Sequence, residues 1–214
     1  DGGYRFTVKA GKPEDAEGAK KGTKVSRGAN FRCLMSGTPI GGDYIKAEGM
    51  AARIGARLMT IVAQGDRERV YLAPAPEHEA AAREANPGWK PEVTISGSTQ
   101  YLGVKPYGMD RLDQLFTGRQ LFALTTFSDL LLEAREHAQC DALAAGLADD
   151  PKPLRDGGAG ASAYAEAVCM YLGIALSRLT DMCNALCGWE ITKTQVRHLF
   201  TRQAIPMMWD FAEN

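Results

Sequence analysis

The stretch TGRQLFALTTFSDLLLEAREHAQCDALAAG, residues 117–146, decides the fold of this chain because it predicts one long helix. Thr117 and Gln120 have the spacing of a capping box, in which the hydroxyl and the amide each bind a main-chain N–H group at the helix start. Apolar residues then recur at steps of three and four, and Gly146 is the residue type that follows a helix end. A helix of roughly 40 Å needs packing partners along its whole apolar stripe.

A second helix is predicted over residues 161–186, because apolar residues recur there with the same period. Its additional apolar residues, Met170, Ile174 and Leu176, indicate contact on more than one side of the helix. The predicted seam consists of Tyr164, Val168, Tyr171, Leu172, Ala175, Leu179, Met182 and Leu186.

A third helix is predicted to begin at Thr192, since Thr192 and Gln195 repeat the capping-box spacing. Pro206 lies inside this pattern and is expected to kink or restart the helix. The apolar face consists of Val196, Leu199, Phe200 and Met207. Three helices of this length are expected to pack as a bundle.

The first half of the chain predicts a β-rich module with one or two short helices. Short strands are expected around a tight turn at residues 36–39, and segments 56–63 and 69–72 predict a hairpin. Residues 77–85 predict a short helix. The predicted fold class is α+β, a small β-rich, ribbon-like module over residues 1–109 followed by the three-helix bundle over residues 110–214.

The balance of 25 Lys and Arg against 26 Asp and Glu excludes a basic footprint over the whole chain, so any surface for nucleic acid must be a local patch. No apolar run is long enough to span a bilayer, and no signal peptide is visible. Five scattered cysteines favour a reducing, cytoplasmic location over a disulfide framework. Because the chain opens on Asp1 and stops directly behind a helical pattern, we expect a piece of a larger protein.

Cys33 begins a sequence that resembles half of a zinc knuckle, Cys-x-x-Cys-Gly, in which Ser36 replaces the second cysteine. Tetrahedral zinc needs four ligands, and the chain has no second pair of this kind, so Cys33 is a degenerate position in a metal-free turn. Cys183 and Cys187 are four residues apart and share a helix face. They suit either two positions of a metal site or, as we favour, the core.

No complete catalytic constellation is present in the sequence. No Asp/Asn-Pro-Pro-aromatic motif occurs, and residues 86–89, Asn-Pro-Gly-Trp, only resemble one. The glycines of residues 156–160 precede a helix, where a phosphate contact is possible, but no strand comes before them as a dinucleotide fingerprint requires. A flexible turn is the favoured interpretation, and an independent enzyme that uses this loop is a weaker hypothesis.

Two local concentrations of basic residues are the candidate DNA contacts. One lies in the β-rich module and the other on the third helix, opposite its apolar face. The candidates are Arg53, Arg57, Arg67, Arg69, Lys193, Arg197 and Arg202. Such side chains position DNA by binding phosphates, although a solvated helix face is the common alternative.

Four blocks of the chain resemble one family. They are RCLMSGTPIGGDYIKAEGMAARIGARLMTIVAQGDRERVYLAP, YGMDRLDQLFTGRQLFALTTFSDL, AYAEAVCMYLGIALSRLTDMCNALCGW and FTRQAIPMMWDFAEN. These blocks are similar to bacterial zinc-ribbon-containing, adenine-specific DNA methylases. The resemblance covers nearly all of the chain after about residue 25 and preserves the order of the blocks.

The resemblance implies a region between two motifs that this chain lacks. In the family, the glycine-rich S-adenosylmethionine motif lies upstream and the catalytic Asp-Pro-Pro-Tyr motif lies downstream. We therefore expect no bound cofactor and no methyl transfer by this chain alone, whereas the parent uses S-adenosylmethionine. The family's ribbon pairs two cysteine knuckles; here the upstream half is missing and Ser36 replaces a cysteine.

Two roles follow from this placement. The first is a non-catalytic, target-recognition-like region that contacts DNA beside the remaining methyltransferase domain. The alternative is a scaffold that docks the catalytic domain or a partner subunit. A continuous basic groove would favour the first role, and an exposed apolar patch would favour the second.

Overall fold

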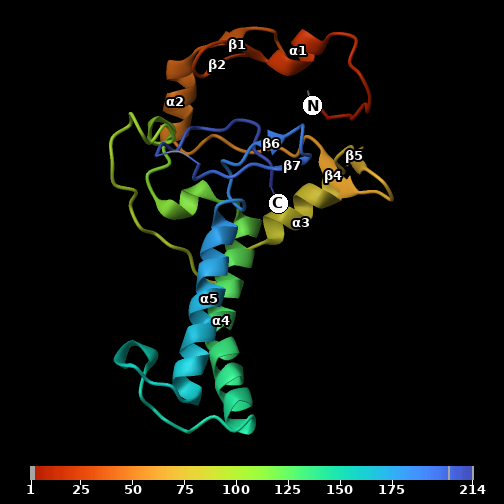
Figure 1. Cartoon of the computed structure of the whole chain (residues 1–214). Helices are drawn as coiled ribbons and strands as arrows, with labels where there is room; N and C mark the ends of the chain where they lie inside the picture. Colours follow the sequence, from red (N-terminus) through yellow and green to blue (C-terminus); the bar gives the residue numbers. More distant parts are fainter. Residues whose placement is uncertain (1–2, 202, 214) are drawn as a thin grey trace. The chain divides into compact units, whose positions relative to one another are not determined.

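The computed structural model describes residues 3–201 and 203–213 and combines helices with short antiparallel sheets (Figure 1). The chain divides into two compact units. Unit 1 contains Asp1–Glu84 and Thr94–Asp110, and unit 2 contains Ala85–Val93 and Arg111–Asn214. The α+β class is confirmed at this level, because β hairpins and short helices form unit 1 and the long helices belong to unit 2.

Unit 1 is built from small elements with few buried side chains. Its first sheet has three short strands in the order β1-β2-β3, and its second is the predicted hairpin, β4 paired with β5. The elements are α1 (Ala16–Lys21), β1 (Lys24–Ser26), β2 (Asn30–Arg32), β3 (Pro39–Ile40), α2 (Gly42–Met50), β4 (Ile61–Gln64), β5 (Arg69–Leu72), α3 (Pro76–Glu84) and the 3₁₀ helix η1 (Lys105–Tyr107).

Helix α2 packs against η1 through two glycines. A Cβ atom on Gly49 would lie 2.6 Å from the carbonyl oxygen of Tyr107, and Gly49 is buried. Gly108 follows η1 in the left-handed conformation, with φ of 83°. The absence of both side chains lets the two backbones meet, and Leu102 and Val104 are buried in the same part of the unit.

Unit 2 contains the two long helices. Its elements are η2 (Leu112–Leu115), α4 (Gly118–Ala144), η3 (Leu154–Asp156), α5 (Ala161–Thr180), β6 (Trp189–Glu190) and β7 (Gln195–Val196). The predicted capping box is confirmed, because Gln120 N donates to Thr117 Oγ1 at 3.2 Å and Thr117 N donates to Gln120 Oε1 at 2.9 Å. The predicted end is also confirmed, since Gly146 has φ of 93° just beyond the helix.

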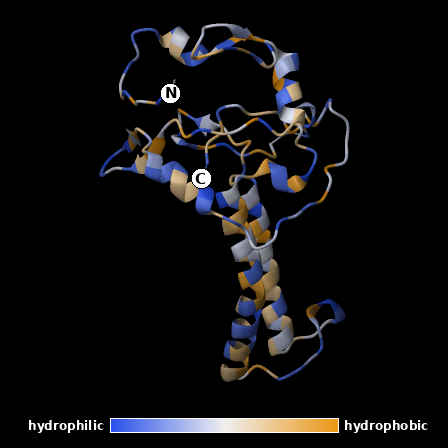
Figure 2. Cartoon of the chain, turned by 180° about the vertical axis from the view of Figure 1, so that it is seen from behind, coloured by the Kyte–Doolittle hydropathy of each residue, from blue (hydrophilic) through white to orange (hydrophobic). Residues whose placement is uncertain are grey.

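Helices α4 and α5 lie side by side and antiparallel (Figure 1). Arg135 Nη2 and Glu166 Oε1 are 2.9 Å apart, and the Cys169 thiol donates to the Leu131 carbonyl at 3.2 Å. Three alanines in the first turns of α5, Ala161, Ala163 and Ala165, are buried. Hydrophobic residues recur along both helices (Figure 2).

The predicted third helix is wrong, and with it the three-helix bundle. Residues 189–196 form a hairpin in which Trp189 opposes Val196, and no helix follows in residues 197–201 and 203–213. Thr194 lies in the turn with φ of 49°, which ends any helical run at that point. Val196 and Leu199 are buried, so the apolar pattern reflects core packing of extended chain.

The core of unit 2 gathers around the end of α5. Cys183 and Cys187 are both buried there, as favoured from the sequence, and burial raises the pKa of each thiol. Ala185 N donates to the Leu115 carbonyl at 2.8 Å, and Ala212 N donates to the Cys187 carbonyl at 2.7 Å. These bonds fix η2 and the last described residues to the same core.

Candidate functional site

Three of the predicted DNA-contacting arginines are paired with carboxylates. Arg53 binds Glu48 with two contacts of 2.8 Å, Arg57 Nε lies 2.8 Å from Glu79 Oε1, and Arg197 Nε lies 2.7 Å from Glu190 Oε2. Pairing with the arginine lowers the pKa of each carboxyl group. A guanidinium that is already paired with a carboxylate contributes little attraction for a phosphate. These three residues are therefore weak candidates for DNA contacts.

Three other predicted candidates, Arg67, Arg69 and Lys193, form no ion pair with a carboxylate in the described part of the chain. Arg67 lies in the turn of the β4–β5 hairpin, and Arg69 begins β5 opposite Gln64. Lys193 lies in the β6–β7 turn of unit 2, on a hairpin instead of a helix face. Arg202 lies outside the described residues. The structure therefore brings Arg67 and Arg69 together on one hairpin but assembles no single cluster from the predicted set.

A more basic surface, missed from the sequence, lies in the N-terminal segment. Residues 3–32 carry eight Lys and Arg against three Asp and Glu, and residues 18–42 carry five cations and no acid. The five are Lys20, Lys21, Lys24, Arg27 and Arg32. All ion pairs among the described residues involve residue 43 or later, so these cations are not neutralised. A charge count over a short window would have found this segment, which the near-zero net charge conceals.

Cys33 lies at the start of a tight turn that main-chain hydrogen bonds close. Gly37 N donates to the Cys33 carbonyl, and Cys33 N donates to the Thr38 carbonyl, both at 2.9 Å. Hydrogen bonds from the Ser36 hydroxyl, and from the main-chain N–H groups of Ser36 and Met35, lower the pKa of the Cys33 thiol. The described residues contain no group of three or more His, Cys, Asp or Glu side chains that could hold a metal ion.

The outward face of α5 carries large apolar side chains that the sequence placed in the seam. Tyr171 is 76% exposed, and Tyr164, Leu172 and Ala175 are also exposed, so their placement in the predicted seam is wrong. Val168 and Leu179 are half-buried, and Met170 and Ile174 extend the exposed surface. The contact on a second side of α5 that the sequence predicts is not seen among the described residues, because Met170 and Ile174 are exposed.

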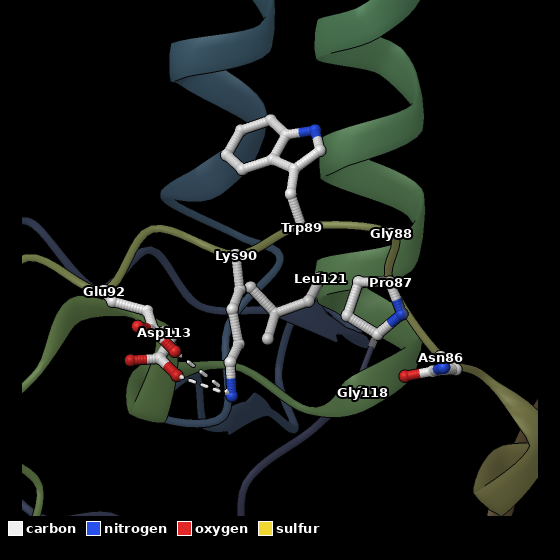
Figure 3. A pocket seen from close by; sticks show the side chains of 9 residues that line it. All are labelled: Asn86, Pro87, Gly88, Trp89, Lys90, Glu92, Asp113, Gly118 and Leu121. Carbon is white, nitrogen blue, oxygen red and sulfur yellow. Dashed lines mark ion pairs between the residues drawn. The ribbon is translucent and has the colours of Figure 1, made fainter.

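A cavity of about 620 Å³ lies between residues 86–92 and the start of α4 (Figure 3). Trp89 and Lys90 point in opposite directions from this segment. The Lys90 ammonium lies 3.5 Å from Asp113 Oδ2 and 3.7 Å from Glu92 Oε1. Trp89 Nε1 donates to Oδ1 of Asp129 on α4 at 2.9 Å. Each charged group that lines the cavity has an opposite charge beside it. These contacts hold residues 86–92 against α4. They are typical of a structural role and not of an active site.

Asp181 forms a buried hub that the sequence did not reveal. Its Oδ2 lies 2.8 Å from His198 Nδ1, and its Oδ1 accepts a hydrogen bond from Phe200 N at 2.7 Å. Because a carboxylate only accepts, Nδ1 of His198 carries the proton. The main-chain oxygen of Asp181 also accepts a hydrogen bond from Leu199 N at 2.9 Å. Together these bonds hold residues 198–200 at the end of α5.

The glycine-rich loop before α5 packs tightly and offers little room for a phosphate. A Cβ on Gly160 would lie 2.6 Å from the Ala148 carbonyl oxygen, and one on Gly158 would overlap the Lys152 carbonyl. Ala161 N, the first amide of the helix, already donates to the Ala148 carbonyl at 2.9 Å. The glycines therefore serve close backbone packing in a well-defined turn.

Comparison with protein-family models finds no matching family, and comparisons with curated proteins and with solved structures find no significant match. None of the described helices is long and apolar enough to cross a membrane.

Proposed function

We propose that this chain is a non-catalytic region of a DNA adenine methyltransferase and acts as a scaffold that docks the catalytic part of that enzyme. The four sequence blocks that resemble the methylase family support the placement. The exposed apolar face of α5 supports the docking role and is the observation that carries it.

This face has the pattern of a helix that packs on two sides. Tyr164, Tyr171 and Ile174 recur at steps of seven and three, and Met170 lies beside them. The exposed fraction is 52% for Tyr164, 76% for Tyr171, 59% for Ile174 and 60% for Met170. Glu166 and Arg178 are the only charged residues among the 20 of α5, and Glu166 is occupied by Arg135.

An apolar helix face is costly to leave in water. Burial of apolar surface contributes about 25 cal/mol per Å², and large contiguous apolar patches on soluble proteins mark interaction sites. Aromatic side chains and methionine are the residue types enriched at protein interfaces. The remaining methyltransferase domain is the proposed occupant, because the resemblance places catalytic and cofactor motifs on either side of this region.

The test is an association measurement between this chain and the separately produced remainder of the methyltransferase. The double variant Met170→Ser/Tyr171→Ser is expected to weaken binding by about 2 kcal/mol or more, roughly thirtyfold, as for central interface residues. Its melting temperature should match that of the wild type, because both side chains already face solvent.

Ile191→Ser is the matched control, since Ile191 is 80% exposed and lies in the β6–β7 turn. It should leave the association unchanged. Equal binding by the α5 variant and the control would remove α5 from the interface. If the wild-type chain does not bind the remainder of the enzyme, the docking role itself is wrong.

Contact with DNA is the second candidate function. It is favoured by the cations that have no carboxylate partner, of which the N-terminal segment holds the most. The ion pairs of Arg53, Arg57 and Arg197 with glutamates argue against these three arginines as DNA contacts. Salt-dependent binding of duplex DNA by this chain would support this candidate, and its absence at low salt would exclude it.

A further inference from the structure

We propose that the hairpin formed by β1 and β2 is a duplex-DNA-binding ribbon, which enters a groove and binds phosphates on both sides through Lys24, Arg27 and Arg32. The inference does not depend on the docking face of α5. It rests on the charge of this segment, on the faces to which its cations belong, and on the rigidity of its turn.

The charge is unopposed along the whole hairpin. No Asp or Glu occurs between Glu17 and Asp43, and none of the cations in this interval forms an ion pair within the described residues. Lys20 and Lys21 add two further charges at the end of α1. A protein gains affinity for DNA with each phosphate that it neutralises, since each contact releases condensed counterions.

The strand register places cations on both faces of the ribbon. Lys24 opposes Phe31, so these two side chains share a face. Arg32 follows Phe31 in the same strand and therefore belongs to the opposite face. Arg27 lies in the turn between the strands. Cations on both faces and at the tip match a groove that has phosphates along both walls.

At the end of the hairpin, Gly42 at the start of α2 lies against Ala29 and Asn30, whereas Arg27 and Gly28 are exposed. Strand β3 pairs only with Phe31 and Arg32, so the part of the hairpin nearest the turn has two strands. Paired strands lie about 4.8 Å apart. The major groove of B-DNA is about 12 Å wide and admits a two-stranded ribbon. A flat bilayer surface would instead favour cations on one face.

The turn is held in one conformation before any ligand binds. Asn30 Nδ2 donates to the Arg27 carbonyl at 2.7 Å, while Asn30 Oδ1 accepts from Gly42 N at 3.2 Å and ties the turn to α2. Gly28 has φ of 78°, as such a turn requires, and Ala29 is buried beneath it. Preorganisation reduces the entropy lost when Arg27 binds a phosphate.

The guanidinium of Arg32 is positioned as well. Its Nη1 donates to the Gly37 carbonyl at 3.3 Å, across the tight turn that contains Cys33. A guanidinium has five donors, so the others stay free for a phosphate. The tight turn thus acts as a support for one of the proposed contacts.

The experiment is a salt titration of duplex binding by fluorescence anisotropy, with the whole chain and a labelled duplex of about 20 base pairs. The triple variant Lys24→Ala/Arg27→Ala/Arg32→Ala should reduce the slope of log K against log salt by about 2.7, at roughly 0.9 per contact. At about 0.1 M salt the same change corresponds to an affinity loss on the order of 10²–10³-fold.

The matched control is Arg67→Ala/Arg69→Ala/Lys193→Ala, which removes the same charge from cations that also have no carboxylate partner. It is expected to change the slope by less than about one. Circular dichroism should show the same melting curve for both variants, since exposed charges contribute little to stability.

Three results would overturn the assignment. The first is no duplex binding at low salt by the wild type. The second is an equal slope change in both variants, which would indicate diffuse attraction. The third is binding to vesicles of phosphatidylcholine and phosphatidylserine that exceeds binding to the duplex and is lost in the hairpin variant. The Met170→Ser/Tyr171→Ser chain should bind the duplex normally, which separates failure of this inference from failure of the docking proposal.

Discussion

Replacement of Gly49 by alanine is expected to destabilise unit 1, although alanine favours a helix. The new Cβ would lie 2.6 Å from the Tyr107 carbonyl oxygen and 2.8 Å from the Tyr107 Cα. Both are main-chain atoms of η1, so no side-chain rotation can relieve the overlap. Helix α2 and η1 must move apart, and the contact between them opens.

The magnitude follows from two opposing effects. Alanine improves helix propensity over glycine by up to about 1 kcal/mol. Overpacking of a buried contact costs about 1–3 kcal/mol, and three main-chain overlaps below 3 Å place this case in the upper part of that range. A net loss of about 1–2 kcal/mol is expected, which corresponds to a fall in Tm of roughly 5–10 °C for a unit of this size.

Gly173→Ala in α5 is the matched control with the opposite sign. A Cβ at Gly173 meets no atom within 4 Å, so only the gain in helix propensity remains, about 0.5–1 kcal/mol. Urea unfolding, with hydrogen exchange of the α2 amides to assign the change to unit 1, measures both effects. If Gly49→Ala stabilises the chain as Gly173→Ala does, the close contact between α2 and η1 is wrong.

Two further predictions concern titratable groups. Burial raises the pKa of Asp181, but hydrogen bonds from Phe200 N and His198, with the charge of Arg178, outweigh it and hold the pKa below its usual value. Its stabilisation is therefore present above about pH 4 and is lost as pH falls, so Asp181→Asn should flatten the acid limb of stability against pH, and an unchanged limb would contradict the hub. The lowered pKa of Cys33 predicts that iodoacetamide modifies it faster near neutral pH than the exposed Cys140. Mass spectrometry measures the rate of modification at both cysteines, and Ser36→Ala should slow modification of Cys33 alone. Equal rates at Cys33 and Cys140 in the wild type would contradict the turn geometry.

Helix α4 could be predicted because its signals are local. The Thr117 hydroxyl and the Gln120 amide act within one turn of helix, and Gly146 needs only its own backbone freedom. The Thr117 hydroxyl also donates to Glu213 Oε1 at 3.0 Å, but its oxygen still accepts from Gln120 N, so this distant contact does not displace the cap. The sequence therefore contained the whole argument for this element.

The third helix failed because the same local pattern has a stronger competitor. Thr192 and Gln195 have capping-box spacing, but Trp189 pairs with Val196 and Arg197 N extends the pairing to the Gly188 carbonyl. The Thr192 hydroxyl binds the Glu190 carboxylate instead of a helix amide. Pairing and burial override the short-range signal, and the spacing alone does not show that.

The ion pairs that make three of the candidate DNA contacts less suitable also depend on the fold. Arg57 receives its partner Glu79 from a helix that begins well after it, so its neutralisation is invisible in a count of nearby arginines. The N-terminal cations without a carboxylate partner were open to prediction from local charge. Their role depends on the register of β1 and β2, which places Lys24 and Arg32 on different faces.

The order in which the units use the chain affects how it folds during synthesis. Residues Ala85–Val93 belong to unit 2 although Thr94–Asp110 returns to unit 1. Helix α2 consequently leaves the ribosome long before η1, its packing partner, and the Gly49 surface stays open in the nascent chain until Tyr107 appears. A truncated chain that ends after Glu84 would contain every strand of unit 1 and still lack the contact that closes it. No single proteolytic cut can separate the two units, because a segment of each unit lies between two segments of the other.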